Sequence, residues 1–124
     1  MKVKEAIMIA DSMKPNQYEF STKVKWLSNL DGMIYQEIFM THEGNMRMPP
    51  HYTVENAEDA ELLVPYPYAE DVYNYFLQSQ IDKENGEIAK YNQSVSMYNN
   101  AFKTFQDWYN RTHRPLPRHA AFRF

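Results

Sequence analysis

The sequence has no cysteine and only three glycines among its 124 residues. The absence of cysteine excludes a disulfide framework and any thiolate metal site. Three glycines are too few for the glycine-rich loop that cradles phosphate groups in many nucleotide-binding proteins. Long apolar runs are also lacking, because the short run at 6–10 is interrupted by Asp11 and Lys14. We therefore expect neither a signal peptide nor a membrane span, but a soluble, single-domain protein made in the cytoplasm.

An apolar stripe in the C-terminal part is the strongest positive signal, with members spaced alternately three and four residues apart. This spacing puts all seven on one side of a single long helix. Five are aromatic, so the face is large and needs cover from shorter helices and, in an assembly, from a neighbouring subunit. We expect the stripe to be core: Ile88, Tyr91, Val95, Tyr98, Phe102, Phe105 and Tyr109.

Two shorter helices are predicted near the N-terminus. The first has a narrow stripe of small and medium side chains and should end before Pro15. The second is expected to start with Ser21 or Thr22 as its N-cap and to end at Gly44, a residue that tolerates the left-handed conformation. Its inner face is predicted to contain Val24, Leu27, Leu30, Ile34 and Ile38.

The third and fourth helices are predicted to form an αα-hairpin. The third should start near Ala69, and Asn85-Gly86 indicates a tight turn into the fourth. One uninterrupted helix through Gly86 is the alternative, since a single glycine costs only ~1 kcal/mol. The hairpin is favoured because an isolated long helix would leave its apolar stripes uncovered.

Residues 45–67 contain four prolines and predict a long irregular loop, with only 61–64 extended. Loops longer than roughly 12 to 15 residues are usually functional or disordered. We therefore interpret this segment as a contact arm that reaches another protomer. The residues expected to make that inter-subunit contact are Tyr52, Glu58, Asp59, Glu61 and Tyr66.

Charge is unevenly distributed along the chain. The net charge of -3 divides into +4 for residues 111–124 and -7 for the remainder. Between Glu43 and Asp71 there are seven acids, and Arg47 is the single basic residue. A basic end and an acidic middle can attract each other within a protomer or between protomers, or can simply be solvated.

Candidate catalytic and metal motifs fail on their spacing. His42 opens a pattern like that of zinc proteases, but no second histidine follows at helical spacing. The acidic segment before Gly86 resembles a calcium loop, yet its twelfth position is Gln93, which is not an acid. Asp59 and Glu61 lie in the acidic loop, where solvated repulsion is favoured over acid/base catalysis. We predict no enzyme, no cofactor and no metal site.

The many aromatic residues are a weak sign of nucleic-acid binding. Base-stacking surfaces carry basic residues between the aromatics, whereas the predicted helices carry mostly acids and amides. Only the arginine-rich tail keeps a DNA contact open. Its prolines and phenylalanines equally suit docking in a groove of a protein.

Four runs of the sequence resemble a family of small proteins from the structural gene clusters of tailed bacteriophages and prophages of Firmicutes. They are WLSNLDGMIYQE at 26–37, ELLVPYPY at 61–68, QIDKENGE at 80–87 and YNRTHRP at 109–115. The resemblance covers about 26–115 and implies a head-tail adaptor or head-completion protein, a structural subunit of the virion neck. Such a subunit assembles as a ring, expected to be twelve-fold, under the portal protein and joins the capsid to tail or stopper proteins.

The resulting expectation is an all-α fold: a small helical bundle around a long αα-hairpin, with a long irregular loop and an extended C-terminal tail. Residues 1–114 would form the adaptor domain and 115–124 a docking tail. The residues expected to dock on the portal or another partner are Arg114, Leu116, Arg118, Phe122, Arg123 and Phe124. Non-specific contact with DNA passing through the ring is also open. The alternative function is a small helical regulatory or host-interaction protein that acts as a monomer or dimer.

Overall fold

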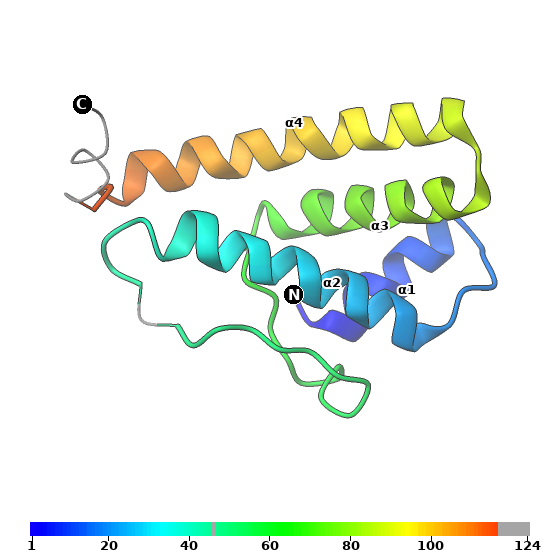
Figure 1. Cartoon of the computed structure of the whole chain (residues 1–124), viewed down its shortest axis with the longest axis horizontal. Coiled ribbons are helices and arrows are strands. Elements are labelled where there is room, and N and C mark those ends of the chain that lie inside the picture. The colour runs from blue at the N-terminus through cyan, green and yellow to red at the C-terminus, as the bar shows by residue number, and fades with distance from the viewer. Residues whose placement is uncertain (46, 117–124) are drawn as a thin grey trace.

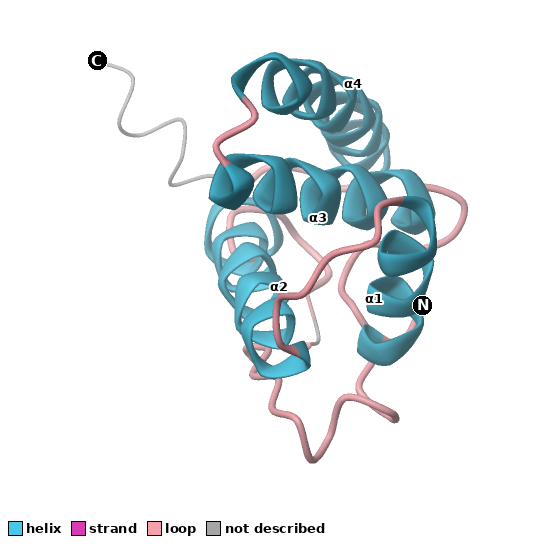
Figure 2. Ribbon diagram, turned by 90° about the vertical axis from the view of Figure 1, so that its right-hand side faces the viewer, coloured by secondary structure: helices cyan, strands magenta, loops and turns pink. Residues whose placement is uncertain are grey.

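The computed structural model describes residues 1–45 and 47–116, which form an all-α fold. Its elements are α1 (Val3–Met13), α2 (Phe20–Ile34), the π-helical turn η1 (Tyr35–Phe39), α3 (Ala69–Asn85) and α4 (Ile88–Thr112). α4 lies over one side of α3, while α1 and α2 lie on the other side (Figure 1). The irregular loop at 40–68 closes the side of α1 and α2 that is remote from α4 (Figure 2). No helix of the described chain is long and apolar enough to cross a membrane.

α3 is the centre of the bundle because it contacts α1, α2 and α4. Its side chains Val72, Tyr73, Leu77 and Ile81 have no solvent exposure at all. The predicted inner face of α2 is buried against it, together with the small residues of α1. The core therefore lies mainly between α3 and the α1–α2 layer, and α4 adds a second, aromatic layer.

The predicted αα-hairpin is confirmed. Gly86 ends α3 in the left-handed conformation, with a φ of 74°, which a residue with a Cβ adopts only under strain. The Gly86 amide donates to the Lys83 carbonyl at 3.1 Å, and the Glu87 amide donates to the Asp82 carbonyl at 3.0 Å. These two bonds satisfy the end of α3 and turn the chain back within two residues, which excludes a continuous helix.

The N-cap of α2 lies two or three residues before the predicted one. The helix begins at Phe20, and the cap is Glu19 rather than Ser21 or Thr22. The backbone of Glu19 is extended, and its carbonyl accepts a hydrogen bond from the Lys23 amide at 3.3 Å. That bond closes the first helical turn earlier than the preference of serine and threonine for N-caps suggested.

The predicted end of the second helix at Gly44 is also wrong. The helix widens into η1 and finishes at Phe39, because the side chains of Thr41 and His42 reach back to its last carbonyl groups. Thr41 Oγ1 donates to the Ile38 carbonyl at 3.0 Å, and His42 Nδ1 lies 2.7 Å from the same oxygen. Gly44, with a φ of 86°, belongs to the turn that follows.

The stripe on α4 is only partly core. Phe105 and Tyr109 are buried, four members are half-buried, and Ile88 is 73% exposed, so the expectation that Ile88 is a core residue is wrong. The physical reason is that Ile88 is the first residue of α4, directly after the hairpin turn, and α1 and α2 lie on the opposite side of α3 (Figure 1). Among the described residues, no third element covers the first turn of α4 at this end of the hairpin.

Replacing one buried and one exposed member of the stripe by alanine should separate core from surface. We expect Phe105→Ala to lower the free energy of unfolding by about 3 to 5 kcal/mol, because a fully buried ring leaves a cavity. Ile88→Ala, at an exposed position, should change it by less than about 0.5 kcal/mol. Urea unfolding of both variants measures the difference, and equal losses would contradict this account of α4.

Candidate functional site

A buried carboxylate joins the long loop to the helices. Asp31 on α2 is fully buried and accepts hydrogen bonds from the hydroxyls of Tyr52 and Tyr73, the latter at 2.7 Å. The backbone amide of Leu63 donates to the same carboxyl at 2.9 Å. The Tyr73 hydroxyl in turn accepts a bond from the Val64 amide at 2.9 Å. One side chain thus fixes two points of the loop and one point of α3.

Burial dominates the electrostatics of this cluster. It raises the pKa of Asp31 above the ordinary value of 3.8, against the lowering effect of the three hydrogen bonds. Burial, and then the neighbouring Asp31, also raises the pKa of the Tyr52 and Tyr73 hydroxyls. Both tyrosines therefore remain neutral donors. The cluster is suited to holding the fold rather than to transferring protons, because Asp31 and Tyr73 have no solvent exposure.

Sequence reasoning missed this cluster although a signal for it exists. Asp31 occurs among the apolar positions Leu27, Leu30 and Ile34, which mark the buried face of α2. An acid on such a face must find donors when the helix packs. The donors come from segments 21 to 42 residues away, which helical spacing cannot identify.

The pH dependence of stability should reveal Asp31. Because its folded-state pKa is raised, its stabilising contribution is fully present below the ordinary pKa of 3.8 and is lost as the pH rises through the raised value. We expect the advantage of the wild type over Asp31→Asn in free energy of unfolding to shrink as the pH rises above about 4. Urea titrations at several pH values measure it, and an advantage that grows with pH would contradict this sign.

A second substitution separates the charge from the hydrogen bonds. Asp31→Leu removes every acceptor and leaves the Leu63 amide and both tyrosine hydroxyls without their partner, at about 1 to 3 kcal/mol for each buried group. Asp31→Leu should therefore be less stable than Asp31→Asn at every pH. Equal stability of the two variants would mean that the hydrogen bonds contribute nothing.

A stack of rings lies where α4 ends. Phe39 of η1 stacks on Tyr109 of α4 with ring centres 5.0 Å apart, and Tyr109 stacks on His113 at 3.9 Å. Trp108 meets His113 nearly edge-on at 6.0 Å. The His42 ring lies between the Ile38 carbonyl and the Asn110 side chain, whose Oδ1 is 2.8 Å from Nε2. These contacts join the end of α4 to the end of η1.

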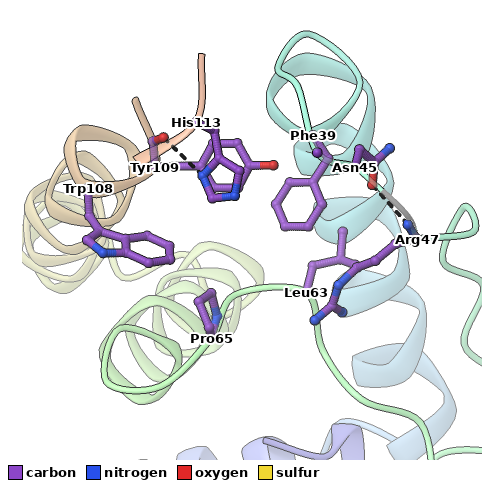
Figure 3. A pocket seen from close by; sticks show the side chains of 9 residues that line it. Phe39, Asn45, Arg47, Leu63, Pro65, Trp108, Tyr109 and His113 are labelled. Carbon is purple, nitrogen blue, oxygen red and sulfur yellow. Dashed lines mark hydrogen bonds between the residues drawn. The ribbon is translucent and has the colours of Figure 1, made fainter. Parts of the chain in front are cut away.

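The stack forms one wall of a pocket of about 310 Å³, shown in Figure 3. Its lining comes from three separate parts of the chain: Phe39, Gly44, Asn45, Arg47, Leu63, Pro65, Trp108, Tyr109 and His113. The Arg47 guanidinium is directed toward the pocket beside Leu63, with its central carbon 5.9 Å from the centre of the Phe39 ring. Within the described residues Arg47 makes no ion pair, so the pocket combines aromatic walls with a guanidinium that has no directly paired carboxylate.

The structure shows two of the six predicted tail-docking residues. Arg114 is exposed and Leu116 is half-buried, while Arg118, Phe122, Arg123 and Phe124 lie outside the described residues. The Glu43 amide donates to the Arg114 carbonyl at 2.8 Å, and the Leu116 amide donates to the Thr41 carbonyl at 3.0 Å. The chain thus remains attached to the helical body through Leu116, two residues past the predicted domain boundary.

Tyr52 is misassigned among the predicted inter-subunit residues. Its side chain is buried and hydrogen-bonded to Asp31, so it anchors the loop from within and cannot contact a neighbour. Glu58 and Glu61 are exposed, but Glu58 pairs with Lys4 at 3.0 Å, and Glu61 pairs with Lys2 and the N-terminal amine.

The other two residues of that group have different surroundings. Asp59 is exposed, and its backbone carbonyl accepts a hydrogen bond from Lys2 Nζ at 3.1 Å. Tyr66 is 92% exposed, which leaves almost its whole ring for contact with another molecule. The loop therefore folds back on its own helices and presents only part of its surface outward.

Comparisons with known proteins give no match: no family model, curated protein or solved structure is similar to this chain. Within residues 1–45 and 47–116, no three histidine, aspartate or glutamate side chains are grouped closely enough to hold a metal ion.

Proposed function

We propose that the chain is a structural subunit of a phage neck: a head-tail adaptor that forms a ring under the portal protein and joins the capsid to tail or stopper proteins. The proposal starts from the four sequence runs that resemble the adaptor family. In this role the protein performs no catalysis, and its surfaces serve assembly.

The observation that carries the proposal is that three of these runs meet in space. Asp31, in the first run, binds the Leu63 amide of the second. Leu63 and Pro65 of the second run line the same pocket as Tyr109 and His113 of the fourth. The remaining run contains Gly86 and makes the hairpin turn between α3 and α4. The runs thus contain residues that hold the elements of this fold together. A family signature without catalytic residues is expected to consist of such residues.

The distribution of exposed apolar side chains also supports assembly. Met8 and Met13 of α1 are 61% and 64% exposed, and Tyr66, which precedes α3, is 92% exposed. A ring subunit needs two different contact surfaces, because a head-to-tail interface closes into a cycle whereas one self-complementary patch gives only a dimer. An acidic body surface additionally suits a conduit that DNA must pass without being retained.

Binding to portal-bearing, tail-less heads of the phage that encodes the chain tests this function. We expect the purified full chain to co-sediment with these heads and Phe122→Ala/Phe124→Ala to lose most of that binding, because aromatic anchors dominate such interfaces. Met97→Ala, on the exposed face of α4, is the matched control and should bind like the wild type.

Three outcomes would count against the proposal in different ways. Wild-type protein that never binds heads and remains a monomer or dimer would favour the regulatory alternative. Undiminished binding of Phe122→Ala/Phe124→Ala would remove the tail aromatics as anchors. Binding that depends steeply on salt but not on the phenylalanines would indicate DNA as the partner.

A further inference from the structure

The aromatic pocket around Arg47 has the chemistry of a receptor for one short acidic segment. Its walls are aromatic and apolar, and its single cation makes no ion pair within the described residues. An arginine beside aromatic rings is a common anchor for a carboxylate at a protein interface. With about 310 Å³, the pocket is at the lower limit for small-molecule sites and suits one apolar side chain next to one carboxylate.

The chain carries a matching segment on a different part of its surface. Val54 is 51% exposed, and the adjacent Glu55 is exposed as well. Within the described residues Glu55 makes no ion pair, whereas Glu58 in the same turn is paired with Lys4. Val54 and Glu55 therefore offer an apolar side chain beside a carboxylate, which is the combination that the Arg47 pocket would accept.

This turn is held in shape before any partner binds. The Thr53 amide donates to Asn56 Oδ1 at 2.8 Å, and the Asn56 amide donates to Thr53 Oγ1 at 3.3 Å. The Lys4 amide at the start of α1 donates to the Ala57 carbonyl at 2.9 Å. A turn fixed in this way loses little conformational entropy on docking.

The turn and the pocket lie on separate surfaces. The pocket is lined by residues where η1 and α4 end, while the hollow beside Val54 is lined by Lys4 of α1 and Phe20 of α2, and the two share no residue. Figure 1 shows the end of α4 at one end of the molecule and the loop below α1 and α2. Contact between two such different surfaces of identical chains is head-to-tail, the type that generates rings.

We propose that the Val54–Glu55 turn of one copy enters the Arg47 pocket of the next copy. Val54 packs against Pro65 and Trp108, and the Glu55 carboxylate pairs with the Arg47 guanidinium. This interface rests on the proposed function, because it supplies the contact between neighbouring subunits of the ring. It also assigns a role to the one basic residue of the acidic segment 43–71.

Charge reversal tests the pairing. Arg47→Glu and Glu55→Arg should each weaken self-association of the full chain at least ~10-fold, measured by sedimentation velocity over a concentration series, because each places like charges together. The double variant Arg47→Glu/Glu55→Arg should restore association, since the charges are complementary again. Lys83→Glu and Glu84→Arg, two exposed positions at the end of α3, make matched charge changes elsewhere and should have no effect.

Cross-linking gives a second readout that detects weak association. The chain has no cysteine, so introduced thiols are unique. A mixture of an Asn45→Cys chain and a Val54→Cys chain, oxidised with copper-phenanthroline, should give disulfide-linked dimers, because this bond forms only when Cα atoms come within about 7 Å. Asn45→Cys mixed with Met13→Cys should not, although Met13 of α1 is 64% exposed, more than Val54 at 51%.

The interface would be overturned if the single charge reversals weaken self-association and the double variant does not restore it. It would also be overturned if sedimentation shows no self-association at any concentration and the Asn45→Cys/Val54→Cys disulfide does not form. If sedimentation shows no self-association but the Asn45→Cys/Val54→Cys disulfide forms, a weak interface between the same surfaces is supported. Wild-type binding to heads without the cross-link would leave the adaptor role standing and remove only this contact. A specific cross-link without wild-type binding to heads would retain the contact and reject the adaptor role.

Discussion

The buried carboxylate of Asp31 is the constraint on which the arrangement of this protein depends. A carboxyl group without solvent exposure needs donors, and here the loop supplies the Tyr52 hydroxyl and the Leu63 amide. A connection as long as 40–68 loses much conformational entropy on becoming ordered, and these hydrogen bonds offset part of that loss. Because Asp31 holds it at two points, the loop packs as a layer of the protein and brings Leu63 and Pro65 to the pocket wall.

A second buried acid secures the other end of the bundle. Asp82 of α3 has no solvent exposure and accepts bonds from Lys14 Nζ at 2.6 and 2.7 Å and from Ser94 Oγ at 2.5 Å. These contacts tie the residue after α1 and the second turn of α4 to the central helix. Each acid thus joins three segments, and removing either one would leave buried polar partners unsatisfied.

The features predictable from the sequence are those that depend on neighbouring residues. The four helices follow from apolar spacing, and the hairpin follows from Gly86, because both signals act within a few residues of the chain. The exposure of Ile88 could not be predicted in the same way, since it depends on where α1 and α2 pack relative to the hairpin. The helix ends before Gly44 because the side chain of Thr41 hydrogen-bonds to the Ile38 carbonyl, a contact that the glycine signal does not reveal.

The candidate site was still less accessible to sequence reasoning. Its pocket combines residues from 39–47, 63–65 and 108–113, and no periodic pattern relates these segments. Arg47 did have a local signal, as the only base in an acidic stretch, but its direction toward the Phe39 ring is a result of packing. Burial of Tyr52 reversed its expected role for the same reason, because its partner lies 21 residues away.

The contacts of α1 have a consequence for the order in which the chain acquires its structure. Its first amides bind the Ala57 and Ala60 carbonyls, and Lys14, just beyond its end, pairs with Asp82, so these three partners are more than 50 residues later in the sequence. During synthesis α1 can contact α2 early, through Asp11 and Lys23, but its contacts with the loop and with α3 must wait until those segments have followed. The local hairpin of α3 and α4 can close rapidly, while docking of α1 requires closure of a long chain segment. α1 is therefore made before α3 but completes its packing only after α3 has formed, and part of its narrow apolar face stays accessible to chaperones until then.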